Sequence, residues 1–160
     1  MMRALVITAS DRAAAGLYED RSGAFAEAGL KDMGFQVERT VVHDGAPVAG
    51  AIANAVAADY EVLVTTGGTG LSERDLTPEM TRPLLTRELP HLAAAVAQRG
   101  VDAGIPTAVL SRGIAGIAQR TLVVNLPGSL GGVRDGMAVL SQVLVHAVNQ
   151  IRGSDDQVHS

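Results

Sequence analysis

Short apolar runs rich in β-branched residues alternate with alanine-rich segments along this chain of 160 residues. The runs predict strands at residues 3–10, 35–44, 61–66, 107–112 and 121–129. Helical spacing of apolar residues predicts helices at residues 21–33, 47–59, 77–89, 90–100 and 131–151. Because strands alternate with helices, we expect a single three-layer α/β domain with a mostly parallel, doubly wound sheet covered on both faces.

Helix signals refine this picture near the middle and the end of the chain. Thr77 is expected to be the N-cap of the helix at 77–89, with Pro78 in its first turn. In the last predicted helix, the residues expected to face the core are Val133, Met137, Leu140, Leu144 and Val148. We expect residues 1–152 to form the domain and the polar residues 153–160 to form a disordered tail.

Composition excludes several classes of function. The chain has no cysteine, which excludes disulfides, thiolate metal sites and a cysteine nucleophile. A net charge of −4 argues against binding to nucleic acid or to an anionic membrane surface. The apolar run in residues 3–10 is too short for a signal peptide or a membrane span, so we expect a cytoplasmic protein.

Glycine and polar residues gather after four of the predicted strands. The four segments are residues 8–23, 41–47, 65–75 and 125–132. Ligands of open α/β sheets bind beyond the carboxyl ends of the strands, so we expect these segments to share one rim and one pocket. Candidate carboxylates on that rim are Asp44, Asp75 and one of Asp11 or Asp20.

The densest of these segments is a glycine loop at residues 67–70, with the sequence GGTG. Gly67, Gly68 and Gly70 can take positive φ angles and expose successive N–H groups, which would form an anion-binding nest. A tight strand-to-helix turn is the alternative, although three glycines exceed what a turn requires. No Lys-Ser or Lys-Thr pair follows the loop, and Glu73 stands where a dinucleotide fingerprint needs its third glycine. The loop is therefore neither a P-loop nor a dinucleotide-binding loop.

Asp44 and Asp75 indicate a metal site only when they are considered together. Asp75 alone can cap a helix, and Asp44 alone fits ordinary turn chemistry. On adjacent strand ends, however, they can hold Mg²⁺, which prefers carboxylate oxygens, water and phosphates. Gly128 and Ser129 offer a second anion-binding point or, alternatively, a plain β-turn, and His43 shows no ligand spacing to another histidine.

Several motifs together resemble the MogA/MoaB-type molybdopterin-binding family of molybdenum cofactor biosynthesis. They are TTGGTGLSERDLTPE (65–79), AVLSRGIAGI (108–117), LVVNLPGS (122–129), SDRAAAGLYEDRSG (10–23) and VVHDGAP (41–47). The resemblance covers nearly the whole chain. It implies a three-layer α/β fold that assembles as a homotrimer or as a dimer of trimers. It also implies Mg-ATP-dependent adenylylation of molybdopterin with release of pyrophosphate, followed by molybdate insertion on a separate protein.

The resemblance assigns roles to individual residues. Asp44 and Asp75 match the catalytic and metal-binding carboxylates. Pterin-binding positions match Thr66, Gly67, Gly68, Thr69, Gly70, Ser111, Pro127, Gly128 and Ser129. Nucleotide-binding positions match Ser10, Asp11, Asp20, Ser22 and Gly23.

The last loop departs from the family pattern. Leu130 and Gly131 replace the proline and lysine that the family often has there, so Arg134, Arg112 or Arg74 would have to supply the positive charge. The alternative function is a non-catalytic module that binds molybdopterin or docks a partner, and a weaker one is a different nucleotide-dependent transferase. The MogA-like and MoaB-like roles, and the molybdenum and tungsten pathways, stay open at this point.

Overall fold

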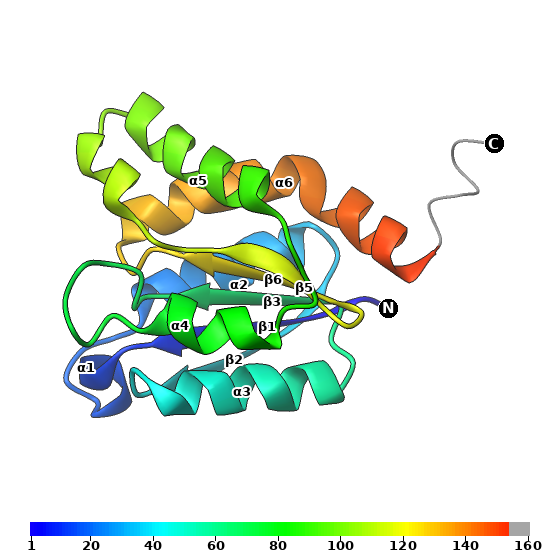
Figure 1. The fold of residues 1–160 in the computed structure, drawn as a ribbon, viewed down its shortest axis with the longest axis horizontal. Coiled ribbons are helices and arrows are strands. Elements are labelled where there is room, and N and C mark those ends of the chain that lie inside the picture. The colour runs from blue at the N-terminus through cyan, green and yellow to red at the C-terminus, as the bar shows by residue number, and fades with distance from the viewer. Residues whose placement is uncertain (154–160) are drawn as a thin grey trace.

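The structure, a computed structural model, describes residues 1–153 (Figure 1). Helices are labelled α, short 3₁₀ helices η and strands β. Their order is β1 (Arg3–Ala9), α1 (Asp11–Ala14), α2 (Arg21–Asp32), β2 (Gln36–Val42), α3 (Ala46–Ala57), β3 (Val62–Thr66), α4 (Thr77–Thr81), η1 (Arg82–Leu84), β4 (Arg87–Glu88), α5 (Pro90–Asp102), η2 (Pro106–Leu110), β5 (Ala115–Ala118), β6 (Thr121–Leu126) and α6 (Leu130–Arg152).

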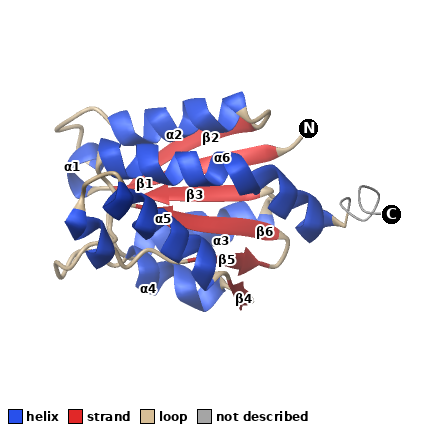
Figure 2. Ribbon diagram, turned by 90° about the horizontal axis from the view of Figure 1, so that it is seen from above, coloured by secondary structure: helices blue, strands red, loops and turns tan. Residues whose placement is uncertain are grey.

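The strands form one sheet in the order β2-β1-β3-β6-β5-β4. Strands β2, β1, β3 and β6 are parallel neighbours, whereas β5 runs antiparallel to both β6 and β4. Helices cover both faces: α2, α5 and α6 lie on one, and α3 and α4 on the other (Figure 2). The predicted α/β class with a mostly parallel, doubly wound sheet is confirmed.

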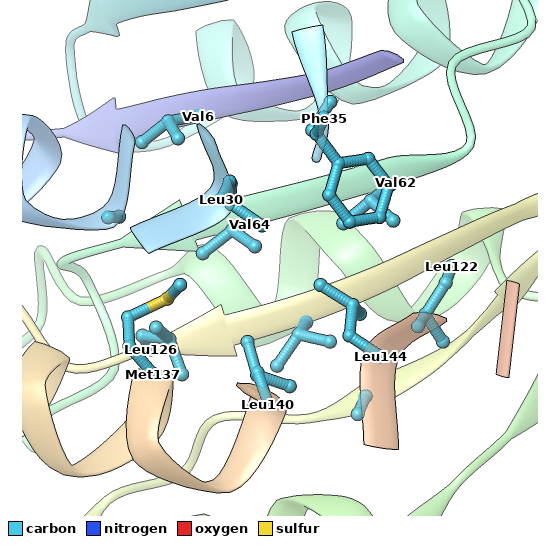
Figure 3. Close-up of a cluster of buried hydrophobic side chains, with 14 of the residues drawn as sticks. Val6, Leu30, Phe35, Val62, Val64, Leu122, Leu126, Met137, Leu140 and Leu144 are labelled. Atoms are coloured by element: carbon cyan, nitrogen blue, oxygen red, sulfur yellow. The ribbon is translucent and has the colours of Figure 1, made fainter. Parts of the chain in front are cut away.

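The core is built almost entirely from aliphatic side chains. In the larger of its two clusters, Val6 and Val64 from the strands meet Leu30 of α2 and Leu140 of α6 (Figure 3). Strands buried on both faces carry continuous apolar runs, and β3 and β6 are buried along their whole length. The inward face predicted for the last helix is confirmed, because all five of its residues are buried in α6.

Two predicted strand assignments near residue 110 are wrong. Residues 107–112 do not form a strand, because most of them belong to η2, where Val109 and Leu110 are 68% and 50% exposed. The strand instead is β5, in a segment that the sequence suggested was a connection. Its sequence AGIA has one β-branched residue and a glycine, so local propensity hides it. Gly116 is required there because a Cβ atom would lie 2.5 Å from the carbonyl oxygen of Arg87.

The predicted helices at 77–89 and 90–100 also differ from the structure. The first is broken into α4, η1 and β4, at a point where Pro83 cannot donate a helical hydrogen bond. The second continues two residues past Gly100, so this glycine does not end the helix. A glycine is needed at this position because a Cβ there would approach Ala108 Cβ to 2.6 Å. In the predicted tail, Gly153 caps α6 with a φ of 78°, and residues 154–160 lie outside the described part of the chain.

Candidate active site

Two adjoining cavities open at the carboxyl ends of the parallel strands. The large cavity has a volume of about 610 Å³ and extends from the glycine loop to α5, η2 and the start of α6. The small cavity has a volume of about 210 Å³ and lies between the end of β1 and the start of α2. Gly67 and Gly128 line both cavities. The two spaces therefore meet where two loops bring glycine backbones together.

The predicted site residues divide between the two cavities. Of the predicted pterin-binding residues, those that line the large cavity are Gly67, Gly68, Thr69, Gly70, Ser111, Pro127, Gly128 and Ser129. Thr66 lines the small cavity instead. Of the predicted nucleotide-binding residues, those that line the small cavity are Ser10, Asp20 and Ser22, whereas Asp11 and Gly23 line neither. Asp75 lines the large cavity, whereas Asp44, the other predicted catalytic carboxylate, lines neither.

The glycine loop adopts the backbone that its glycines allow. Gly67 and Gly68 have φ angles of 88° and 70°, but Gly70 does not have a positive φ, contrary to expectation. Gly70 is needed for space, since a Cβ there would lie 2.8 Å from Asp75 Oδ2. The Gly67 N–H donates to the carbonyl oxygen of Leu126 at 3.1 Å. The N–H groups left for an anion therefore begin at Gly68 rather than at Gly67.

Thr77 holds the loop from the opposite side. Its hydroxyl donates to the Gly67 carbonyl at 2.9 Å, and its N–H donates to the Gly68 carbonyl at 3.0 Å. The N-cap of α4 is Leu76, so the prediction that Thr77 caps the helix is wrong. With five residues, α4 also has a smaller dipole than the predicted helix would have. Thr77 thus fastens the loop instead of starting a long helix.

Three carboxylates approach one another beside the loop. The N–H of Asp44 donates to Asp11 Oδ1 at 3.1 Å, and the N–H of Asp11 donates to Asp44 Oδ2 at 3.3 Å. Asp44 Oδ1 lies 3.3 Å from the position of a Cβ on Gly68. Burial raises the pKa of Asp44, and the negative charges of Asp11 and Asp75 act in the same direction. Asp44 and Asp75 thus lie close enough for the negative charge of Asp75 to help raise the pKa of Asp44.

Asp11 carries the positive partners of this cluster. Its pKa is lowered, first by the hydrogen bond with His43 and then by the bond from the Asp44 N–H. His43 Nδ1 lies 3.0 Å from Asp11 Oδ1, and Arg74 Nη1 lies 3.2 Å from Asp11 Oδ2. His43 is therefore part of the cluster, although its spacing to other histidines gives no sign of this. The basic side chains thus contact Asp11 and not Asp44, whose pKa is raised.

Asp75 has a structural bond as well as a place in the cavity wall. Its Oδ2 accepts a hydrogen bond from the Ser72 N–H at 3.0 Å, while its own N–H donates to the Ser72 carbonyl at 3.1 Å. The side chain therefore closes the turn at 72–75 with one oxygen. Within the described residues, Oδ1 accepts no protein hydrogen bond. Asp75 can thus cap a turn and offer a second oxygen to a ligand.

Arg112 fixes the second half of the loop. Its Nε donates to the Gly70 carbonyl at 2.8 Å, and Nη2 donates to the Asp75 carbonyl at 2.5 Å. Two further bonds, at 2.8 and 3.0 Å, reach the carboxylate of Glu79, whose pKa the guanidinium lowers. From the sequence, Arg112 is expected only as one possible source of the positive charge missing from the last loop. In the structure, it determines where the backbone of Asp75 lies.

At the small cavity, both carboxylate oxygens of Asp20 accept hydrogen bonds from the protein. Its Oδ2 accepts from the Thr8 hydroxyl at 2.6 Å, and its Oδ1 accepts from the Gly23 N–H at 2.9 Å, which caps α2. Gly23 has no room for a side chain, because a Cβ would lie 2.1 Å from Asp20 Oδ2. The Ser22 hydroxyl donates to the Gly128 carbonyl at 2.8 Å and so connects the two cavities.

Sequence reasoning missed the cavity walls formed by α5, η2 and the second turn of α6. The main additions are Leu71, Ala93, Val96, Ala97, Gly100, Ile105, Thr107, Ala108, Leu110, Gly113, Asn125, Gly131, Gly132 and Asp135. Gly100 was the available signal, because a glycine inside a helix often marks close packing. Among the described residues, no group of three or more histidine, cysteine or acidic side chains could hold a metal ion. Mg²⁺ commonly binds through one or two carboxylates with water and substrate phosphates, so two carboxylates meet that need.

A doubly wound sheet with cavities at its carboxyl rim defines a ligand-binding α/β domain. A family model described as "Probable molybdopterin binding domain" matches residues 5–146. The chain belongs to this molybdopterin-binding family, which confirms the resemblance noted from the motifs. Among the described residues, none of the helices has the length and hydropathy that a membrane span needs.

Relatives and solved structures of the same family match most of this chain. The molybdopterin biosynthesis Mog protein from Mycobacterium ulcerans superposes with a TM-score of 0.91 at 47% identity, covering 94% of this chain and 99% of that one. A molybdopterin adenylyltransferase from Helicobacter pylori is 34% identical over 161 residues, covering 96% of this chain and 90% of the relative. A molybdenum cofactor biosynthesis bifunctional protein from Chlorobaculum tepidum is 36% identical over 94% of this chain. The chain spans about half, 49%, of that bifunctional protein's length.

We predict that Gly68→Ala destabilises the fold by at least about 1–3 kcal/mol. The φ of 70° strains any residue with a Cβ, and that Cβ would meet Thr77 Oγ1 at 2.1 Å. Gly50→Ala in α3 is the control, because a Cβ there meets nothing within 4 Å. It should stabilise the protein by about 0.5–1 kcal/mol. Urea unfolding measures both, and equal effects of the two substitutions would contradict the argument.

We predict that Asp44→Asn stabilises the protein at pH 7. The folded-state pKa of Asp44 lies above the ordinary aspartate value of 3.8, so ionisation of Asp44 disfavours folding. This penalty is complete above the raised pKa and disappears as the pH falls towards 3.8. Unfolding curves at stepped pH between these limits should show the variant's advantage shrinking on acidification. A variant less stable than wild type at pH 7 would contradict this account.

We predict that Arg112→Lys loosens residues 69–75 without unfolding the domain. Lysine cannot reproduce the forked contacts to Gly70, Asp75 and Glu79. Loss of one or two such bonds, at about 1 kcal/mol each, should speed local hydrogen exchange about five- to thirtyfold. Arg82→Lys, which changes an exposed ion pair with Glu88, is the control. An unchanged rate of hydrogen exchange at residues 69–75 in the Arg112 variant would refute this role of Arg112.

Proposed function

We propose that this protein is a molybdopterin adenylyltransferase of molybdenum cofactor biosynthesis. A phosphate oxygen of molybdopterin attacks the α-phosphorus of ATP, the bond to the β-phosphate oxygen breaks, and pyrophosphate leaves. The observation that carries the proposal is the junction of two cavities at Gly67 and Gly128, with Asp75 in the wall of the large cavity and Asp44 Oδ1 3.3 Å from the position of a Cβ on Gly68. Each cavity can bind one of the two substrates. At the junction, where the reacting groups would meet, the two cavities share only the glycines Gly67 and Gly128 among the described residues.

The two cavities differ in ways that suit the two substrates. The large cavity has apolar walls from Val96, Ile105 and Leu110, which suit a planar ring system. The small cavity has the hydroxyls of Ser10, Tyr18 and Ser22, which suit a ribose and its phosphates. The nucleophile is already an anion, so little acid–base chemistry is needed and most of the catalysis is positioning. The N–H groups from Gly68 onwards provide donors for a phosphate.

Asp44 and Asp75 are the residues that would hold Mg²⁺. Both are oxygen ligands, and the ionised form of Asp44 is disfavoured by burial and by its acidic neighbours, so a cation there relieves repulsion. When bound, Mg²⁺ neutralises the triphosphate and stabilises the charge that develops on pyrophosphate. The Arg112 contacts keep Asp75 in place for this role, and Arg74 is held by Asp11 at the cluster's edge.

The wider assignment rests on the family resemblance. We propose that the protein acts in the cytoplasm as a homotrimer, or as a hexamer made of two trimers, and passes its adenylylated product to a molybdate-insertion protein. We expect it to bind neither nucleic acid nor a membrane. Size-exclusion chromatography with light scattering gives the oligomeric state directly.

We predict that Asp75→Asn lowers Mg-dependent adenylylation by at least about 10²–10³-fold, the usual effect of removing one group that stabilises the transition state. The asparagine can still accept the Ser72 N–H, so the turn and molybdopterin binding should persist. Pyrophosphate release from ATP with molybdopterin measures the reaction, and equilibrium titration measures binding.

The control for this experiment is Asp32→Asn, at an exposed residue that lines neither cavity. It should match wild type in both measurements. Near-normal turnover of Asp75→Asn would refute the metal-site assignment. If the wild-type protein binds molybdopterin but releases no pyrophosphate at any Mg²⁺ concentration, the protein is a binding module instead.

A further inference from the structure

Beyond the glycine loop, the large cavity continues between α5, η2 and α6. Apolar residues of α5, of η2 and of the link between them form its walls: Ala93, Val96, Ala97, Ile105, Ala108 and Leu110. Figure 2 shows α5 and α6 beside one another on the same face of the sheet. The first turn of α6 lines the route into this part through Gly131, where a Cβ would meet nothing within 4 Å. This inner part is thus an apolar space without a basic residue among its described lining.

One acidic side chain faces this space. Asp135 lines the cavity from the second turn of α6, and its Oδ2 lies 3.8 Å from the position of a Cβ on Gly100 of α5. The absence of a side chain at Gly100 leaves the carboxylate uncovered on that side. Within the described residues, Asp135 makes no ion pair or hydrogen bond. A half-buried carboxylate with two acceptor oxygens and no protein donor needs its donors from water or from a ligand.

The hydrogen-bonding capacity of a carboxylate indicates which part of a ligand it would bind. A carboxylate accepts two parallel N–H bonds, and such charge-assisted pairs are strong and directional. The 2-amino-4-oxopyrimidine ring of a pterin offers a matching edge, because its ring N3–H and its 2-amino group lie side by side. We propose that Asp135 binds this edge of the pterin and so sets the orientation of the whole substrate. The proposal rests on the proposed function.

The position of Asp135 fits that orientation. Asp135 lies six positions after Ser129, the N-cap of α6, which corresponds to about 9 Å along the helix. A pterin held at Asp135 therefore extends its phosphate arm back towards Gly128, where the two cavities meet. Adenine has no pair of adjacent donors on its pairing edge, so the same carboxylate disfavours the base of ATP in the large cavity. Asp135 would thus keep the two substrates in separate cavities.

The experiment compares two rings that differ only at this edge. The probes are 6-hydroxymethylpterin and 6-hydroxymethyllumazine, which has a second oxo group in place of the 2-amino group. Fluorescence titration of the wild-type protein should show a pterin preference of about ten- to hundredfold, as expected for a lost hydrogen bond to a charged group. Asp135→Asn should abolish or reverse this preference, because an amide presents one acceptor and one donor. The control Asp32→Asn should keep the wild-type preference.

Several outcomes would overturn the assignment. A pterin preference that survives in Asp135→Asn, with the fold intact by circular dichroism, would remove Asp135 from ring recognition. Guanine carries the same edge, so GMP is the second probe. Displacement of the pterin by GMP at lower concentration, in a manner that depends on Asp135, would assign the site to a nucleotide and overturn the proposal.

The proposed function is tested separately on the same variants. If the wild-type protein releases pyrophosphate and Asp135→Asn keeps both its pterin preference and its KM for molybdopterin, this inference fails and the proposed function stands. If the wild-type protein shows the Asp135-dependent preference but releases no pyrophosphate, the proposed function fails and the ring contact stands. A rise in KM for molybdopterin of the same factor as the lost preference supports both.

Discussion

The close approach of two glycine backbones determines the architecture of this site. A Cβ on Gly67 would lie 2.3 Å from the Ala9 carbonyl oxygen, and a Cβ on Gly128 would lie 3.2 Å from Gly67 Cα. The Gly67 N–H also donates to Leu126, so the loop is joined to the ends of β1 and β6 at once. Any larger residue at either glycine would separate the loops. Because no side chain intervenes, ligands in the two cavities can come into contact.

The rest of the loop is held by side chains that never need to touch a ligand. Thr77 fastens its first half and Arg112 its second half, in each case through backbone carbonyls. Bonds to carbonyls orient the loop and do not use the N–H groups from Gly68 onwards. They also fix the positions of Asp75 and of the turn that it closes. The position of Asp75 therefore depends on residues from α4 and from the segment before β5.

The sequence predicts the parts of this structure that follow from periodicity and from residue chemistry. The parallel strands, the buried face of α6 and the shared rim all follow from apolar spacing and from the rule for strand ends. Residues 107–112 and β5 were assigned wrongly, because an exposed apolar run resembles a strand while AGIA does not. Asp135 was missed because it follows no strand, and only the packing of α5 on α6 brings it to the cavity.

The distribution of charge around Asp44 separates the requirements of stability from those of function. Arg74 and His43 both contact Asp11, which leaves Asp44 with a raised pKa beside two other acidic residues. Selection for stability alone would place a basic side chain against Asp44, since unpaired buried charge disfavours folding. A basic side chain there would, however, compete with a metal ion for the same oxygens. A site that binds Mg²⁺ together with substrate phosphates requires an acidic residue that has no basic side chain paired with it. Natural active sites commonly give up stability in this way.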